Sequence, residues 1–171
     1  KWSGSFKAQK MKSIFNLARS SGRGSKEATR NRANEGGEVF LARQHLQVHK
    51  FPIEAEHVSD LCADGHTSFD GFLPVTIHLR GYTIVLVLCY LHPSVGVGGS
   101  NAARMTRLGA FLRSLRLPWL CVGDFNIAPE KLRASKCLQR VQGQIHRAPC
   151  DYTCSTSGGK SLIDYVIAGP G

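Results

Sequence analysis

The sequence predicts an α+β fold, in which helices pack on a mixed β-sheet. Two strongly β-prone runs, 72–79 and 82–90, are joined by the two-residue turn Arg80-Gly81, as in an antiparallel hairpin. A helical pattern follows at 100–117, and further β-prone runs lie at 118–125 and 162–167. Because hairpin and crossover connections are mixed along the chain, we expect a sandwich of sheet and helices.

The first third of the chain divides into a basic arm and the start of a folded domain. Residues 1–34 are rich in Ser, Gly, Arg and Asn, which is typical of a flexible or poorly ordered segment, although 11–18 could form a short helix. A strand is predicted at 38–43, after Gly36-Gly37, and residues 53–70 are acidic and rich in turns. We therefore expect an arm at 1–34 and a partial domain at 35–171. Since both ends look cut, we also expect a fragment of a larger unit.

The central elements follow from periodicity. The run 82–90 is apolar on both faces, which predicts a strand in the middle of a covered sheet. Ser100 or Asn101 is the predicted cap of a helix that ends near Leu117, before Pro118, and a second helix is predicted at 129–138. Five apolar residues share one face of the first helix: Met105, Leu108, Phe111, Leu112 and Leu115. Its arginines are a solvated face or, alternatively, a binding surface.

The charge distribution indicates the kind of partner, and the cysteine content indicates the cellular compartment. The formal charge is +10, with +8 in residues 1–34, −4 in 35–103, +7 in 104–147 and −1 in 148–171. Two basic zones favour a polyanion such as nucleic acid, with a merely basic soluble protein as the alternative. The six cysteines without a secretory signal favour an intracellular location, in nucleus or cytoplasm, and not secretion. The longest apolar run, 82–91, is too short to cross a membrane.

Polar residues interrupt two of the predicted strands. Asp124 and Asn126 follow an apolar run and alternate with Phe125, so both side chains can project together while Phe125 enters the core. An Asx turn that closes the strand is the alternative. Asp164 lies inside Leu-Ile-Asp-Tyr-Val-Ile, where a buried carboxylate needs a donor, a cation or a metal. An exposed aspartate at the sheet edge is the other interpretation.

Four segments, in order, resemble motifs of the endonuclease/exonuclease/phosphatase superfamily. They are Gly36 to Leu46, the strand-Tyr-x-x-Pro segment from Ile84 to Pro93, Gly123-Asp124-Phe125-Asn126, and Ser161 to Ile167. The resemblance covers about residues 36–169. It implies a four-layer α/β/β/α sandwich with two mixed, mainly antiparallel sheets flanked by helices, and metal-dependent hydrolysis of a phosphodiester.

The resemblance also implies roles for particular residues. Asp124 would orient or deprotonate the attacking water and contact the metal, Mg²⁺ or Mn²⁺, and Asn126 would hold a phosphate oxygen. Tyr90 would hydrogen-bond the phosphate or another site residue, and Asp164 would fix the tautomer of a histidine. Arg104, on the basic helix, is a further candidate for substrate binding.

Two departures from the family pattern lower the expected activity. The early Asn and the metal-ligating Glu have no match in residues 1–35, and the terminal Asp-His pair would fall beyond Gly171. We therefore expect a metal-dependent nuclease domain, acting on nucleic acid and most readily DNA, that is weakly active or inactive as given. The alternatives are a non-catalytic nucleic-acid-binding relic of the same fold and a phosphatase or lipid phosphodiesterase.

Weaker signals carry no assignment. His146, Cys150 and Cys154 would need a fourth ligand, such as Cys137, to bind zinc. Gly159-Lys160-Ser161 resembles the end of a phosphate-binding loop, but Cys154 stands where that loop needs glycine. His92 lies near Tyr90 in sequence and is more simply a loop residue.

Overall fold

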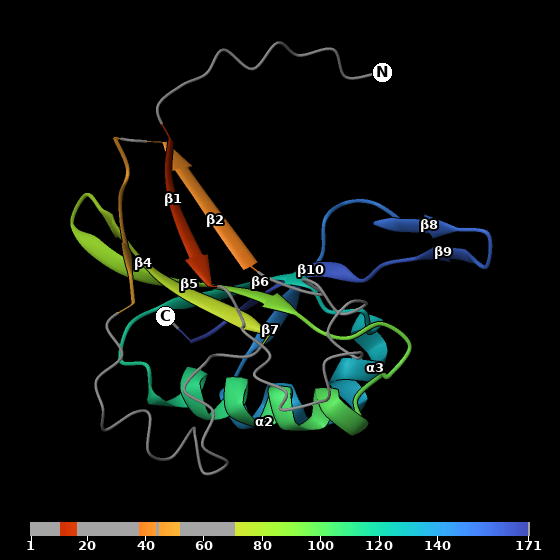
Figure 1. Cartoon of the computed structure of the whole chain (residues 1–171). Helices are drawn as coiled ribbons and strands as arrows, with labels where there is room; N and C mark the ends of the chain where they lie inside the picture. Colours follow the sequence, from red (N-terminus) through yellow and green to blue (C-terminus); the bar gives the residue numbers. More distant parts are fainter. Residues whose placement is uncertain (1–10, 17–37, 44, 52–70, 171) are drawn as a thin grey trace, which may run out of the picture.

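A six-stranded sheet forms the centre of the molecule in a computed structural model, which describes residues 11–16, 38–43, 45–51 and 71–170 (Figure 1). The strand order is β3-β4-β5-β6-β10-β7, and every neighbouring pair is antiparallel except β5 and β6. The strands are β3 (Gln47–Lys50), β4 (Phe72–Leu79), β5 (Tyr82–Tyr90), β6 (Trp119–Asp124), β7 (Gln144–His146) and β10 (Asp164–Ala168). The prediction of a mixed, mainly antiparallel sheet is confirmed.

Helices cover one face of this sheet. They are α2 (Gly99–Ser114), α3 (Pro129–Ala134) and α4 (Cys137–Val141), and α2 and α3 lie below the sheet in Figure 1. Alternate residues of β5, including Val85, Val87 and Cys89, are buried in one cluster with Leu108 and Phe111 of α2. The helix face predicted from the 3.6-residue period is therefore the buried one.

A two-stranded sheet covers part of the opposite face. Strands β1 (Met11–Asn16) and β2 (Glu38–Arg43) pair antiparallel and lie above the central sheet in Figure 1. β2 packs against β4 and β5, and Ala42 is buried in a second cluster with Leu73 and Val75. The described residues therefore form three layers, helix, sheet and sheet, of the expected four-layer sandwich.

Several local predictions are wrong, and tertiary contacts explain why. Residues 11–16 form a strand instead of the helix predicted at 11–18, because they pair with 38–43 along their whole length. Helix α2 begins at Gly99 with Gly98 as its cap, and no side chain caps it. The predicted helix 129–138 is two short helices, separated where Lys136 adopts a left-handed conformation (φ 60°).

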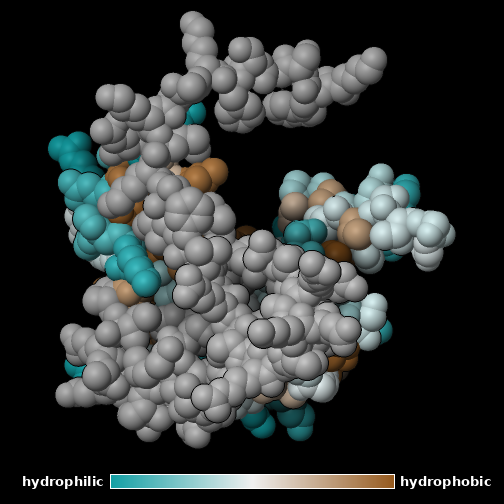
Figure 2. All heavy atoms as spheres, in the orientation of Figure 1, coloured by the Kyte–Doolittle hydropathy of each residue, from teal (hydrophilic) through white to brown (hydrophobic). Residues whose placement is uncertain are grey.

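A small hairpin was not predicted. Strands β8 (Cys154–Thr156) and β9 (Gly159–Ser161) pair antiparallel and stand off from the body beside β10 (Figures 1 and 2). The residues of this hairpin are exposed, except that Cys154 is half-buried. Gly159 and Lys160, set aside as a phosphate-binding loop, lie on β9. Within the described residues, no helix is long and apolar enough to cross a bilayer.

The thiols in the strands behave as small apolar side chains. Cys89 and Cys121 are free and buried, on neighbouring strands of the helix-side face. A hydrogen bond with Cys89 and burial raise the pKa of the Cys121 thiol. The Cys121 thiol is therefore neutral, and both cysteines pack as small apolar core residues, as the sequence suggested.

Gly123 permits the close approach of β5 and β6. Its φ is +155°, and a Cβ atom at this position would overlap the backbone carbonyl of Cys89. We expect Gly123→Ala to lower the free energy of unfolding by at least about 3 kcal/mol, since overpacking and backbone strain each cost about 1–3 kcal/mol. Urea unfolding followed by circular dichroism measures the change.

Gly158→Ala is the matched control. A Cβ at Gly158 would meet Thr156 Oγ1 at 3.6 Å, an ordinary contact in an exposed turn, so its effect should stay within about 0.5 kcal/mol. Equal stability of the Gly123 and Gly158 variants would contradict the packing argument.

Candidate active site

Three polar residues form a row across neighbouring strands. Asp124 is the register partner of Tyr90 in the parallel pair β5–β6 and of Asp164 in the antiparallel pair β6–β10. Their sequence neighbours Cys89 and Tyr165 belong to the cluster on the helix side. Since side chains alternate along a strand, the row lies on the opposite face, at one end of the sheet.

Asn126 joins this row through the turn that follows β6. Its backbone N–H donates to Asp124 Oδ1 at 2.9 Å, and its side-chain Nδ2 donates to the carbonyl of Leu91 at 2.7 Å. Its φ is +49°, a left-handed conformation that asparagine tolerates. Both interpretations of the motif therefore hold together: an Asx turn is present, and it brings the carboxamide to Asp124.

A buried aromatic pair supports the turn from the helix side. Phe125 is buried, and its ring stacks on Tyr165 with centroids 4.3 Å apart. The Tyr165 hydroxyl donates to the carbonyl of Ile127 at 3.1 Å, and the Phe125 N–H donates to the carbonyl of Ile163 at 2.9 Å. Burial raises the pKa of Tyr165, so its hydroxyl remains a donor. These contacts fix the end of β6 against β10.

The Asp124 carboxyl has an elevated pKa. Partial burial is the largest cause, and the facing charge of Asp164 adds to it. Hydrogen bonds from the backbone and side chain of Asn126 act in the opposite direction. A carboxylate that is costly to ionise binds a proton or a cation more readily than an ordinary one, which is a property of many catalytic carboxylates.

Asp164 is exposed, so the interpretation as an exposed aspartate holds, and its carboxylate needs no buried partner. Its backbone is held instead: the N–H groups of Ile163 and Asp164 both donate to Thr153 Oγ1 at 3.0 Å. Thr153 also donates its own N–H to the carbonyl of Ser161 at 3.0 Å. The sequence carried no signal for Thr153, because its partners are ten and eleven residues away.

Arg104 lies behind the row. Its Nη1 donates to the carbonyl of Tyr90 at 3.3 Å, from α2 on the helix side. A role in substrate binding therefore remains a prediction, while its contact with the backbone of Tyr90 is direct. The Tyr90 and His92 rings meet edge to face, with centroids 6.5 Å apart.

Asn101, predicted as a helix cap, braces the loop next to Tyr90. It is fully buried, accepts from the N–H of His92 at 2.8 Å, and donates to the carbonyls of His92 and Gly96 at 3.0 and 2.8 Å. A buried, fully hydrogen-bonded side chain of this kind sets one loop conformation. The loop 92–98 is thus held beside the row.

The donors suited to a metal are the two facing carboxylates. Magnesium is commonly held by one or two protein carboxylates together with water and substrate phosphate, and Asp124 and Asp164 are of this type. Among the described residues, no three His, Cys, Asp or Glu side chains lie close enough together to hold a metal ion. His146, Cys150 and Cys154, considered above as zinc ligands, are therefore not gathered into such a group.

The layered architecture and its strand order define an endonuclease/exonuclease/phosphatase-like fold, which confirms the resemblance seen in the sequence. No protein-family model and no curated protein matches the chain significantly. Among the solved structures that share the fold, three match more than nine-tenths of this chain. The endonuclease domain of TRAS1, a telomere-specific non-LTR retrotransposon, has 13% identity and a TM-score of 0.59, with 93% of this chain and 67% of that one covered.

The other two structures come from a bacterium and from human. An endonuclease/exonuclease/phosphatase family protein from Leptotrichia buccalis has 12% identity and a TM-score of 0.55, with 95% of this chain and 61% of that one covered. The human Nocturnin catalytic domain with bound sulfate has 13% identity and a TM-score of 0.56, with coverage of 93% and 60%. This chain therefore spans about three-fifths to two-thirds of their length, and the likeness concerns the fold.

The raised pKa of Asp124 predicts a stabilising substitution. In the folded state the pKa of this carboxyl lies above the value of about 3.9 seen in unfolded chains. Stability therefore falls as the pH rises through the folded-state pKa. Asp124→Asn should raise the free energy of unfolding at pH 7 by about 0.2–1 kcal/mol, the scale of a cross-strand pair.

Thermal unfolding in EDTA at pH 3 and pH 7 measures this difference, which should vanish at pH 3. Asp151→Asn, which removes an exposed carboxylate outside the row, is the control. A variant that is less stable than wild type at pH 7 would show that the carboxylate stabilises the fold.

Proposed function

We propose that this chain is a divalent-metal-dependent phosphodiester hydrolase domain that acts on nucleic acid. The observation that carries the proposal is the row Tyr90, Asp124 and Asp164 in strand register, with Asn126 tied to Asp124 by a 2.9 Å hydrogen bond. Phosphoester hydrolysis needs an aligned water and neutralised phosphoryl oxygens, and little covalent chemistry from the protein.

Each side chain has a role in this proposal. Asp124, whose pKa is raised, accepts the proton of the attacking water and aligns it. Asn126 presents its carboxamide to a phosphoryl oxygen, because the Leu91 carbonyl and the turn limit its rotation. The Tyr90 hydroxyl donates to the phosphate, and Asp164 accepts from a histidine or from a water of the site.

A metal fits the chemistry of the same residues. Asp124 and Asp164 would hold Mg²⁺ or Mn²⁺, since their charges face each other across one strand pair and raise the pKa of Asp124. When bound, the ion supplies positive charge to the phosphoryl oxygens and lowers the pKa of a water. The metal-ligating Glu of the family has no match in the sequence, so we expect slow turnover.

Nucleic acid is the favoured substrate because of charge. The chain carries a net charge of +10, which suits a polymer of phosphates better than a small phosphoester. One of the three similar structures is an endonuclease domain. DNA is the first substrate to test, and a reducing nuclear or cytoplasmic setting suits the free cysteines Cys89, Cys121, Cys137, Cys150 and Cys154.

Single-turnover cleavage of a fluorescent DNA duplex, with excess protein and saturating Mg²⁺ or Mn²⁺, tests the proposal. We expect Asp124→Asn to lower the rate at least about 100-fold, the scale of a general base, and Asn126→Ala to lower it similarly. Asp151→Asn should cleave like wild type, because its carboxylate lies outside the row.

The same samples separate the alternatives. Retained DNA binding, with no cleavage in wild type and no change in Asp124→Asn, would indicate a non-catalytic relic. Turnover of a soluble phosphomonoester or a lipid headgroup, with DNA left intact, would indicate a phosphatase or lipid phosphodiesterase. Either result would overturn the nuclease proposal.

A further inference from the structure

An open pocket lies between α3, α4 and β7, on the helix side of the sheet. Its volume is about 550 Å³, and Leu138 and Ile145 supply its apolar surface. Both residues pack with the helix-side core. Five further residues complete the lining: Arg133, Gln139, Gln142, Gly143 and Gln144.

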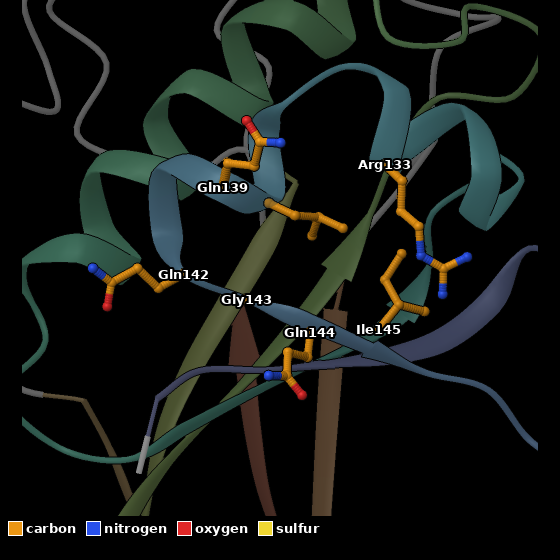
Figure 3. A pocket seen from close by; sticks show the side chains of 7 residues that line it. Arg133, Gln139, Gln142, Gly143, Gln144 and Ile145 are labelled. Carbon is orange, nitrogen blue, oxygen red and sulfur yellow. The ribbon is translucent and has the colours of Figure 1, made fainter.

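Figure 3 shows how these groups are arranged. The three glutamines extend in different directions from α4, from the turn after it and from β7, around Gly143, while Arg133 lies across from them next to Ile145. The turn is tight, because Gln142 is left-handed (φ 53°) and the Gly143 N–H donates to the carbonyl of Leu138 at 2.9 Å. A Cβ at Gly143 would meet Ile167 Cγ2 at 2.8 Å, so glycine keeps this turn against the sheet.

The surface around the pocket is strongly basic. Between Pro129 and Arg147 the exposed side chains include one acid, Glu130, and five cations: Lys131, Arg133, Lys136, Arg140 and Arg147. Glu130 lies between two of them, 3.7 Å from Arg133 Nη1 and 3.4 Å from Arg147 Nη1. One carboxylate therefore positions two guanidinium groups and neutralises only one charge.

This pocket is separate from the polar row. Gln144 is the register partner of Ala168, at the opposite end of β10 from Asp164. Four residues of strand correspond to about 13 Å, and Leu138 and Ile145 of the pocket belong to the helix-side core, whereas the row lies on the opposite face. The pocket groups therefore have no part in the chemistry proposed for Asp124.

We propose that this pocket, with its basic surroundings, binds a single-stranded segment of nucleic acid. Arg133 and the neighbouring cations neutralise phosphates, and the face of an unpaired base lies on the half-buried Ile145. The amides of Gln139 and Gln142 offer both donors and acceptors, as the edges of bases require, whereas the Gln144 side chain lies on the other face of the sheet with its register partner Ala168. In a duplex the base edges are already hydrogen-bonded to each other, so the amides could not reach them. An acidic peptide presents carboxylates, which need only hydrogen-bond donors and would not use the acceptors of the amides.

Fluorescence anisotropy in EDTA, which prevents metal-dependent cleavage, tests this site with labelled twelve-nucleotide RNA and DNA. Single strands should bind more tightly than the corresponding duplex. Arg133→Gln should weaken single-strand binding about fivefold to tenfold, the effect of one charge-assisted hydrogen bond. It should also reduce the salt slope by about 0.7. Gln139→Ala, an exposed helical change, should weaken binding without changing the salt slope.

Arg80→Gln is the matched control, since Arg80 is an exposed arginine in the β4–β5 turn and loses the same charge. It should bind like wild type, and because EDTA prevents cleavage, the result does not depend on the proposed hydrolase activity. If Arg133→Gln and Arg80→Gln lose affinity equally, binding depends on net charge alone, and the proposal is overturned. Preference for duplex, or full displacement by poly-glutamate, would also overturn it, the second in favour of an acidic protein partner.

Discussion

The parallel pairing of β5 with β6 is the constraint on which the candidate site depends. It is bracketed by backbone hydrogen bonds, Val85 N–H to Pro118 at one end and Leu91 N–H to Asp124 at the other. A parallel pair needs a crossover, and α2 provides it while covering the same strands with its apolar face. The two strands thus end at the same level, and their last residues, Tyr90 and Asp124, become neighbours.

The partly buried carboxylate of Asp124 lowers the stability of the fold, and hydrogen bonds from Asn126 limit this cost. The pKa of Asp124 is raised by burial and by Asp164, yet the Asn126 N–H stabilises its charged form. Asn126 in turn adopts a left-handed conformation, held by its bond to Leu91. Phe125 and Tyr165 pack below the turn on the helix side. The fold therefore keeps two facing carboxylates close by making the backbone around them rigid.

The basic residues of 104–147 are not all exposed, although the sequence presents them as one zone. Arg104 is half-buried, and its guanidinium donates a hydrogen bond to the Tyr90 carbonyl instead of lying fully in solvent. The cations of 131–147 are exposed on the short helices and beside β7. Charge counted along the chain therefore indicates a polyanionic partner but does not locate where it binds.

By itself, the sequence determined the elements whose pattern is local and strong. The β4–β5 hairpin, the apolar face of α2 and the order of the Asp124 and Asp164 strands followed from periodicity, turn residues and motif spacing. Tertiary structure decided what depends on partners distant in sequence. Residues 11–16 became a strand by pairing with β2, Asn101 became a loop brace, and Thr153 came to hold the backbone of Asp164. Local propensities differ by less than about 1 kcal/mol per residue, so hydrogen bonds and burial between distant segments override them.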